Sequence, residues 1–475
     1  MDELDELTLR LHSRYQPQVE ADRYINSLRI NPNADHFIMI EPGKGYLINA
    51  LRKNYPDAKI VVLHADSRFR NAVSGICMWY PGSGDVQEFL EKQIPDTATV
   101  RIIEWQPSLN VFGEIYLWLV RESAAFVKRT VAGRRTTAAF GNRWVKNFFR
   151  NLLIINDYVL YRQMDMPVVV TGAGPSLEKI MPKIIAAREG IFILAASSSL
   201  QALQAGGILP DMVIATDGGG WALAHLHSFF RSACAAARTK VALYLCAAVP
   251  SRYSAIPLLP LSDGSLWQSI ALNAAGIPSI SFPQRGTVTA SAIDLAMVLT
   301  CGDIYLAGMD LSVDGIKSHA RPNAFESMLY DSASRTQPVY SQYFKRSRDI
   351  ISGGSMEIYA SWFKGSIASW PERIFTLGGN HEVFEKGLPE KQLNAGKRTY
   401  VPDFFGIAAL KDSPEGRLKR AVGAISAALD DPKYSSALAD ELAPLLLPSE
   451  KKPSSRETAQ ALHKILQRYR EDTRG

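Results

Sequence analysis

Short apolar runs alternate with amphipathic stretches along the N-terminal third of the chain. The predicted elements are a polar helical region at 1–35, strands at 36–40, 58–63 and 100–105, an amphipathic helix at 46–54, and helical stretches at 109–128 and 138–160. A strand, a glycine-containing loop, a helix and a second strand in this order indicate an α/β unit. We therefore predict a Rossmann-like domain over residues 1–160 that ends in a helical connector.

The alternation becomes more regular after residue 160. The predicted strands lie at 166–170, 191–196, 212–215, 241–246 and 303–307, and the predicted helices at 178–188, 200–205 and 290–299. Repeated strand–helix–strand order at this spacing is typical of a parallel sheet with helices on both faces. Residues 161–395 are accordingly assigned to a central parallel-sheet domain.

The strand pattern fades after residue 395. Pro414 stands at the start of a stretch with helical apolar spacing that reaches Leu429, and Ser454 and Glu457 match a capping box before a second such stretch. We expect residues 396–475 to be a helical C-terminal region that packs on the core. Binding of a protein acceptor or self-association is the alternative use of these helices.

Composition is that of an ordinary globular protein. The chain has 475 residues, too many for one typical domain, and 47% of them are hydrophobic and 21% charged. The net charge of +6 is spread along the chain, which suits an anionic substrate but gives no reason to expect a nucleic-acid partner. Composition alone therefore indicates a globular protein with a sizeable core and does not identify its function.

Cysteine usage and the chain start bear on the compartment. The four cysteines are far apart and form no CxxC pair, so we expect neither a disulfide framework nor a zinc site; they are Cys77, Cys234, Cys246 and Cys301. The acidic start lacks the order of a signal peptide, and no apolar run reaches the ~18 residues of a membrane helix. These features predict a cytoplasmic protein that does not enter a membrane.

A glycine-rich loop, Gly172-Ala173-Gly174-Pro175-Ser176-Leu177, follows one predicted strand and opens a helix. Gly172 and Gly174 would let backbone N–H groups approach an anion closely, and a helix N-terminus favours negative charge. Ser176 is expected to donate its hydroxyl to a phosphate or to cap the helix. The alternative is a tight turn that binds nothing.

Small polar residues follow the later strands of the central domain. They are Ser197, Ser198, Asp217, Gly308 and Asp310. The carboxyl ends of parallel strands meet at one edge of a sheet, so we expect these residues to share an edge with the glycine loop. Each one alone is equally explained as a helix cap, but together they predict a polar ligand site.

Two further residues are candidates for the chemistry. His319 lies in a polar loop after Asp310 and is a candidate acid or base near neutral pH. Arg285 precedes Thr287 and an apolar helix, where it is expected to pair with a phosphate or a sugar carboxylate. The alternatives are an exposed loop histidine and a surface arginine.

Three stretches in order carry a family resemblance: residues 168–177, residues 205–217, and residues 304–311. Together they resemble the motility accessory factor family, the flagellin glycosyltransferases of motile bacteria. The shared domain is also similar to 6-hydroxymethylpterin diphosphokinase of the archaeal type. The resemblance covers roughly residues 36–395.

A more distant resemblance is to the small bacterial sialyltransferases that use CMP-sialic acid. They have a similar glycine-Pro-Ser loop and a Gln-Arg-x-Thr segment, matched here by residues 284–287, ahead of a Gly-x-Asp motif, matched by residues 308–310. The resemblance implies that His319 corresponds to their catalytic base. Residues 377–380, ending in Asn380, are an approximate counterpart of their nucleotide loop.

The resemblance implies transfer of a nonulosonic acid, of the pseudaminic or legionaminic type, from its CMP donor to Ser or Thr of flagellin. His319, Asp310 and Arg285 would be catalytic, with His319 taking the acceptor proton and Arg285 and the loop amides stabilising the phosphate. The remaining residues assigned to donor binding are Gly172, Gly174, Ser176, Ser197, Ser198, Asp217, Thr287, Gly308 and Asn380. These relatives imply no metal and no cofactor besides the CMP-activated sugar, and a homo-oligomer is allowed.

Three rival hypotheses stay open. The first is a pterin diphosphokinase that uses ATP and magnesium, with Asp217 and Asp310 as metal ligands. The second concerns the first domain, where residues 41–45 with Asp66 resemble a dinucleotide or methyl-donor site, although a structural Rossmann-like unit is favoured. The third is a non-catalytic flagellin chaperone that uses the helical ends.

Overall fold

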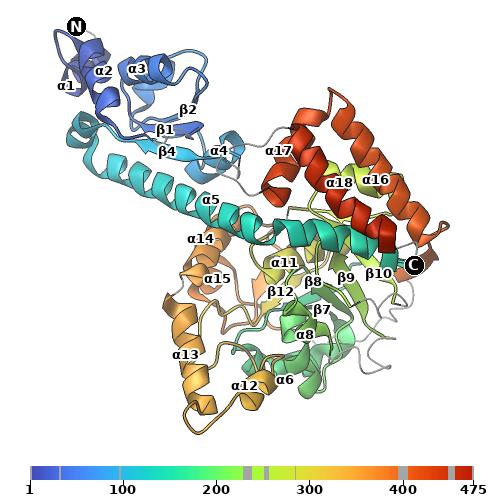
Figure 1. The fold of residues 1–475 in the computed structure, drawn as a ribbon. Coiled ribbons are helices and arrows are strands. Elements are labelled where there is room, and N and C mark those ends of the chain that lie inside the picture. Colours follow the sequence, from blue (N-terminus) through green and yellow to red (C-terminus); the bar gives the residue numbers. More distant parts are fainter. Residues whose placement is uncertain are drawn as a thin grey trace. The chain divides into compact units, whose positions relative to one another are not determined.

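The chain divides into two compact units (Figure 1). The computed structural model describes residues 3–30, 34–95, 98–227, 238–250, 256–283, 285–352, 354–393, 405–447 and 455–472. The first unit extends to Ala139, and the second begins at Phe140. The division falls inside one long helix, whereas the sequence placed a domain boundary at residue 160.

The first unit is built on a four-stranded parallel sheet in the order β3-β2-β1-β4. Its elements are α1 (Glu3–Leu11), α2 (Pro17–Ser27), β1 (His36–Ile40), α3 (Tyr46–Asn54), β2 (Lys59–Leu63), β3 (Cys77–Trp79), α4 (Val86–Gln93), β4 (Val100–Ile103) and the start of α5 (Gln106–Ile154). Alternate residues of β1 enter two cores. Phe37 packs with α2 and α3, and Ile38 packs with α4 and α5. The sheet is therefore covered on both faces, as its apolar strands predict.

Helix α5 differs from the two separate helices expected at 109–128 and 138–160. A kink at Gly113, whose φ of 50° and ψ of −117° are not helical, interrupts it near its start, and from there the helix runs on to Ile154. The predicted helix to residue 160 is wrong at its end, because Asp157–Tyr161 form strand β5. Val159 of β5 is buried in the core of the second unit, and this packing decides the strand conformation.

The second unit contains a ten-stranded sheet, with nine strands in the order β13-β12-β6-β7-β8-β9-β10-β5-β14 and β11 paired to β10. The strands not yet bounded are β6 (Val168–Thr171), β7 (Phe192–Ala196), β8 (Met212–Ala215), β9 (Lys240–Tyr244), β10 (Leu258–Ser262), β11 (Ile280–Ser281), β12 (Ile304–Ala307), β13 (Ile374–Thr376) and β14 (Phe405–Ala409). All pairings are parallel except that of β14 with β5. The predicted parallel sheet is confirmed.

The strand order reverses between β6 and β12. From β6 the chain proceeds through β7, β8, β9 and β10 on one side, and then returns to place β12 on the other side of β6. In open parallel sheets such a switch point leaves a crevice at the carboxyl ends of the two strands. The loops after Thr171 and Ala307, which carry the predicted site residues, begin at this point.

Helices cover the sheet and complete the second unit. They are α6 (Leu177–Ala187), α7 (Leu200–Ala205), α8 (Ala222–His227), α10 (Leu266–Ala275), α11 (Val288–Leu299), α12 (Glu326–Asp331), α13 (Val339–Ser352), α14 (Ser355–Ile367), α15 (Glu382–Gly387), α16 (Pro414–Asp430), α17 (Ser435–Leu446) and α18 (Ser455–Asp472). Helix α11 packs against β6, β7 and β8. The three strands are buried along their whole length, which explains their continuous apolar sequence.

The C-terminal region is largely helical, as predicted, and its described residues belong to the second unit. Helix α16 begins at Pro414 with the Ser413 hydroxyl capping the Gly416 N–H, and it packs on α10. One strand was missed, because β14 extends the sheet beside β5 with little apolar alternation. Ser454 of the predicted capping box lies outside the described residues. No helix in the described part of the chain has the length and apolarity to cross a membrane.

Candidate functional site

The glycine loop joins the carboxyl ends of β6 and β12 by direct backbone contact. The Gly172 N–H donates to the Ala307 carbonyl at 2.8 Å, and the Gly174 N–H donates to the Gly308 carbonyl at 2.8 Å. A Cβ atom on Gly172 would lie 2.4 Å from the Gly308 oxygen, and Gly308 itself has a φ of +69°. The glycines are therefore required by the close approach of two loops at the switch point.

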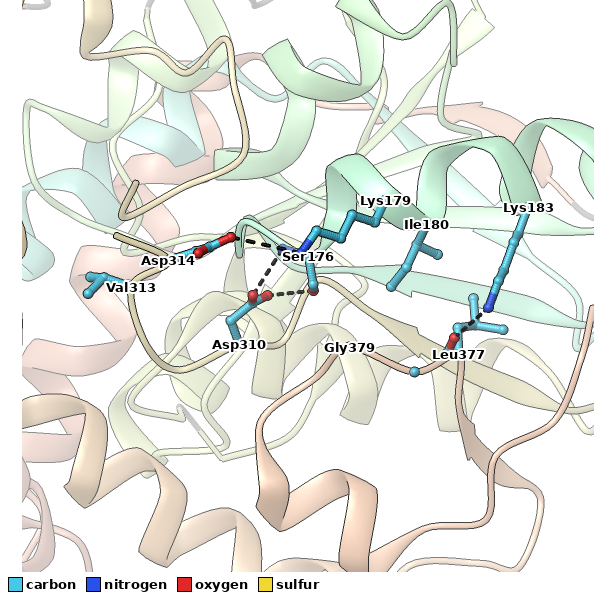
Figure 2. Close-up of a pocket in the computed structure, with 10 residues that line it drawn as sticks. Ser176, Lys179, Ile180, Lys183, Asp310, Val313, Asp314, Leu377 and Gly379 are labelled. Atoms are coloured by element: carbon cyan, nitrogen blue, oxygen red, sulfur yellow. Dashed lines mark hydrogen bonds and ion pairs between the residues drawn. The ribbon is translucent and has the colours of Figure 1, made fainter. Parts of the chain in front are cut away.

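Ser176 and Asp310 connect the same two loops through a side chain (Figure 2). The Asp310 carboxylate accepts the Ser176 N–H at 2.9 Å and the Ser176 hydroxyl at 2.6 Å. It thus takes the place of an anion at the N-terminus of α6. Burial raises the pKa of the Asp310 carboxyl, while the two bonds from Ser176 oppose the rise.

These contacts already use four of the N–H groups that were predicted to form a phosphate cradle. The N–H groups of Gly172, Gly174 and Ser176 donate to other protein atoms, and the Leu177 N–H donates to the Gly174 carbonyl at 3.1 Å. A phosphate that used the Ser176 N–H would have to displace Asp310. The reason is topological, because the loop after β12 lies against the glycine loop and supplies its acceptors.

A cavity of about 500 Å³ opens beside Ser176 and Asp310 (Figure 2). Its lining residues are Ser176, Lys179, Ile180, Lys183, Asp310, Val313, Asp314, Leu377, Gly378 and Gly379. Lys183 donates to the Leu377 carbonyl at 3.2 Å, and Lys179 lies 3.9 Å from the Asp314 carboxylate. We did not predict these two lysines, although their spacing of four on the helix after the glycine loop places them on one face.

The segment that contains His319 is bonded to the glycine loop and to the first turn of α6. The Ala320 N–H donates to the Ala173 carbonyl at 2.8 Å. Glu178, in the first turn of α6, accepts from Lys317 at 2.8 Å and from the Arg321 N–H at 2.9 Å. Arg321 and Glu178 are 143 positions apart in the sequence. The fold therefore brings the segment that contains His319 next to the glycine loop.

His319 is a neutral imidazole near pH 7. Burial lowers its pKa to about 4, with smaller contributions in the same direction from Arg346 and His225. Its Nδ1 lies 3.1 Å from the Ser318 hydroxyl. A neutral ring has a lone pair with which to accept a proton, as a general base must, although a pKa near 4 makes it a weak base.

Asp217 lies at the end of β8 on the same sheet edge. Its carboxylate is exposed and accepts the Gly219 N–H at 2.7 Å. Burial lowers the pKa of His225. The charge of Asp217 opposes this shift, and the charge of Arg346 adds to it. Burial raises the pKa of Tyr359, and Asp217 adds to that rise. His225, Arg346 and Tyr359 were missed because only the fold brings α8, α13 and α14 to this edge.

Arg285 and Thr287 already have partners within the protein. The Arg285 Nε donates to the Asp294 carboxylate at 2.7 Å, and its guanidinium lies 5.1 Å from the centre of the Trp362 ring. The Thr287 hydroxyl accepts the Ala290 N–H at 3.1 Å and caps α11. The alternative of a helix cap therefore describes Thr287, and Gln284 of the same segment lies outside the described residues.

Asn380 bonds within the protein with both ends of its side chain. Its Oδ1 accepts the Met309 N–H at 2.8 Å, and its Nδ2 donates to the Leu306 carbonyl at 3.0 Å and to the Thr376 hydroxyl at 2.7 Å. It therefore fixes the loop after β12 to the loop after β13. Ser197 is buried and Ser198 partly exposed in the short turn after β7.

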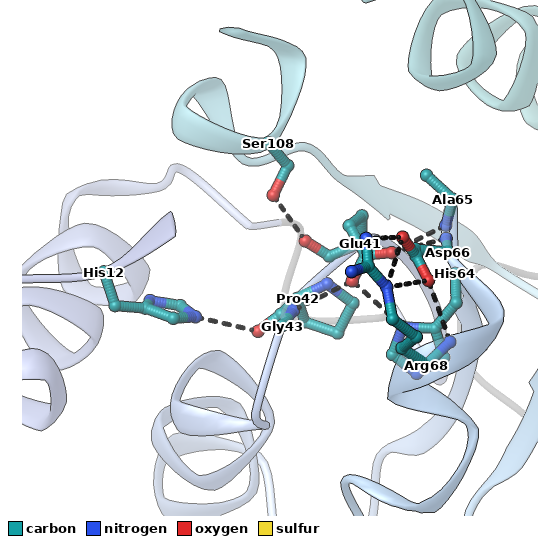
Figure 3. Close-up of polar contacts among 9 residues, drawn as sticks. All are labelled: His12, Glu41, Pro42, Gly43, His64, Ala65, Asp66, Arg68 and Ser108. Atoms are coloured by element: carbon teal, nitrogen blue, oxygen red, sulfur yellow. Dashed lines mark hydrogen bonds and ion pairs between the residues drawn. The ribbon is translucent and has the colours of Figure 1, made fainter. Parts of the chain in front are cut away.

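The first unit has a separate polar cluster around Glu41 (Figure 3). The buried carboxylate accepts the Ala65 N–H at 2.6 Å, the Gly43 N–H at 3.2 Å and the Asp66 N–H at 3.3 Å, and it lies 3.0 Å from His64 Nδ1. Glu41 has a φ of +42°, an uncommon value outside glycine. Its carboxylate thus connects residues 41–45 with the segment at Asp66, the two segments for which the sequence suggested a dinucleotide or methyl-donor site.

Comparison with known proteins places these features in a family context. Residues 142–315 match the family described as "6-hydroxymethylpterin diphosphokinase MptE-like". A stretch of 305 residues is 30% identical to an uncharacterized protein of Treponema pallidum (strain Nichols), and it covers 62% of this chain and 64% of that relative. The chain thus spans slightly less than two thirds of this relative.

The fold is similar to that of the MAf glycosyltransferase of Magnetospirillum magneticum AMB-1. The similarity has a TM-score of 0.50 at 15% sequence identity and covers 99% of this chain and 78% of that structure. At this identity the similarity shows a shared fold. Together with the MptE-like match, it supports the resemblance to motility accessory factors that the sequence indicated.

Proposed function

We propose that this protein is a glycosyltransferase that transfers a nonulosonic acid, of the pseudaminic or legionaminic type, from its CMP donor to serine or threonine of flagellin. The observation that carries the proposal is the double contact of the glycine loop. The loop binds Asp310 through Ser176 and holds the His319 segment through Ala173. An acid and a neutral base are thereby joined at the switch point, where ligands of open α/β sheets bind.

The proposed reaction needs one proton acceptor and one stable leaving group. The acceptor oxygen forms a bond to the anomeric carbon, and the bond from that carbon to the phosphate oxygen breaks with its electron pair leaving on CMP. His319 takes the proton of the acceptor hydroxyl. Asp310 and Asp217 lie on the same edge and would contact the ribose, base or sugar, and no metal is required by this scheme.

The finer assignments belong to the same proposal. The protein acceptor is flagellin, the reaction is cytoplasmic, and a homo-oligomer is compatible with it. Their support is the fold shared with a MAf glycosyltransferase over 99% of this chain and the order of the sequence motifs.

The test is a transfer assay with CMP-pseudaminic or CMP-legionaminic acid, with and without flagellin. We expect CMP release that depends on flagellin and an increase in flagellin mass by one or more sugar residues. CMP release without a mass increase would mean donor hydrolysis and would contradict the proposal. Flagellin binding with no turnover would favour the chaperone hypothesis.

A second candidate is pyrophosphoryl transfer from ATP to 6-hydroxymethylpterin, because residues 142–315 match a family of that description. Asp217 and Asp310 would then hold magnesium, although both Asp310 oxygens already accept bonds from Ser176. Release of AMP in the presence of ATP, magnesium and the pterin would support this candidate. No AMP release would leave the glycosyltransferase proposal in place.

A further inference from the structure

Arg346 is a half-buried cation beside the predicted base. It lies on α13, and its guanidinium carbon is 4.8 Å from the centre of the Phe325 ring. The ring of His225 contacts the same phenyl group edge-on, with ring centres 4.9 Å apart. Arg346 and His225 are therefore held by one aromatic side chain.

Arg346 differs from the neighbouring cations in having no acidic partner. Arg285 pairs with Asp294, Arg321 with Glu326, and Lys317 with Glu178. Within the described part of the chain, no carboxylate lies within 4.0 Å of the Arg346 guanidinium. Burial lowers its pKa, so the folded protein maintains a positive charge there at a cost in desolvation.

The surroundings of Arg346 suit an anion. His225 and His319 each carry imidazole nitrogens at this place, and the Nδ1 of His225 is buried without a hydrogen-bond partner among the described residues. Asp217 is the acid whose charge acts on His225. The Asp217 carboxylate is exposed and accepts the Gly219 N–H.

We propose that Arg346, stacked on Phe325 with the imidazoles of His225 and His319 beside it, binds one anionic group of the donor. A guanidinium forms paired hydrogen bonds equally well with a phosphate and with a carboxylate. The donor proposed above carries one of each, and in that respect this inference depends on the proposed function. The site itself requires only an anion of this shape.

The site is distinct from the two lysines near Asp310. Lys179 and Lys183 line the 500 Å³ cavity, which Arg346 does not line, and Lys183 donates to a backbone carbonyl. The charge of Arg346 acts on His319, whose segment is bonded to the glycine loop through Ala173. An anion at Arg346 would therefore lie next to the proposed base.

The test is calorimetric titration with four probes: inorganic phosphate, CMP, N-acetylneuraminic acid, which has a carboxylate and no phosphate, and neutral cytidine. We expect Arg346→Gln to weaken the probe that uses the site by about ten- to a hundredfold and to leave cytidine unchanged. Loss for phosphate and CMP assigns the donor phosphate, and loss for the sugar acid assigns the carboxylate. Unchanged binding of all anionic probes would overturn the proposal.

Two further variants separate recognition from folding. Arg348→Gln removes an exposed charge from the same helix and is expected to change no titration. Arg346→Lys keeps a charge but not the paired geometry, so it should retain part of the affinity; binding lost in Arg346→Gln and equally lost in Arg348→Gln would contradict a specific site. None of these titrations needs flagellin or turnover, so the anion site can stand if the transfer assay fails.

Discussion

The carboxylate of Asp310 accepts both the backbone N–H and the hydroxyl of Ser176, although 134 positions separate the two residues. The bond therefore locks the loop after β12 to the first turn of α6. Since both loops start at the switch point of the sheet, their distance is fixed before any ligand binds. A ligand that enters here therefore contacts mainly side chains, because the backbone N–H groups of Gly172, Gly174 and Ser176 already have acceptors.

Gly174 tests how tightly this junction is packed. A Cβ atom there would lie 1.9 Å from an Asp310 carboxylate oxygen and 2.8 Å from the Gly308 carbonyl, so Gly174→Ala must displace one of the two loops. We expect a loss of about 2 kcal/mol in the free energy of unfolding, together with loss of CMP binding. Denaturant unfolding and calorimetry measure the two effects.

Gly365→Ala is the matched control. Gly365 lies within α14, and a Cβ atom there would meet no atom within 4 Å. Alanine should stabilise this helix by up to about 1 kcal/mol and leave CMP binding unchanged. Equal behaviour of the two variants would contradict the close packing at Gly174.

The pKa of His319 predicts how stability depends on pH. The folded value of about 4 is below the ordinary 6.5, so the unfolded chain takes up this proton first as the pH falls. The stability that depends on the neutral ring is complete above pH about 6.5 and decreases toward pH 4, by up to about 3 kcal/mol. We expect His319→Gln to flatten the fall in unfolding free energy between pH 6.5 and 5.

Other groups near His319 define the control for that experiment. Arg346 of α13 and His225 of α8 face the ring, and His225 also has a lowered pKa, so part of the slope should remain in His319→Gln. His227→Gln changes an exposed ring at the end of α8 and should leave the slope as it is. A slope unchanged in His319→Gln would mean that the ring titrates normally.

His319 also has a predicted kinetic role. If it takes the acceptor proton, His319→Ala should lower the rate of transfer to flagellin by about a hundredfold or more while CMP binding changes little. Single-turnover mass spectrometry of flagellin measures the transfer step, and calorimetry measures donor affinity. Transfer at the normal rate would exclude His319 as the base.

The sequence predicted the sheet edge because that prediction needs only local patterns. The apolar run ending at Thr171 and the run ending at Ala307 are strands of one parallel sheet, so Gly172 and Gly308 had to follow strand ends on the same side. Strand order could not be obtained in this way, and neither could the contact of Asp310 with Ser176. That contact depends on β12 lying next to β6, which no local pattern specifies.

The residues around His319 could not be identified from the local sequence pattern. Arg346 and Tyr359 lie on helices without any motif. Arg346 matters because no carboxylate of the described residues pairs with its charge, and Tyr359 matters because it is buried near the charge of Asp217. Conversely, Thr287 was assigned to nucleotide binding from a motif, while its hydroxyl caps α11. A motif identifies a segment, but only the packed structure shows which of its polar atoms are already used.

Asn380 is predicted to stabilise the fold more than it contacts the donor. In Asn380→Leu the Met309 N–H loses its acceptor inside the protein, and two donated bonds are lost. We expect the free energy of unfolding to fall by about 3 kcal/mol. Asn273→Leu, at an exposed position of α10, should change it by less than about 0.5 kcal/mol. A higher KM for the donor at unchanged stability would instead show direct contact with nucleotide.

Glu41 gives a corresponding prediction for the first unit. Glu41→Gln keeps the shape of the side chain but replaces one acceptor oxygen with an NH₂ group, which cannot accept a hydrogen bond. Depending on which oxygen is replaced, the bonds from Ala65 and Asp66 or the bonds from Gly43 and His64 are lost. We expect a loss of about 2 kcal/mol, seen as faster amide hydrogen exchange in β1 and β2. Glu114→Gln, whose side chain is 89% exposed, should leave exchange unchanged. Unchanged exchange in Glu41→Gln would contradict this stabilising role, and binding of NAD or S-adenosylmethionine by the unaltered protein would indicate a ligand site in the first unit.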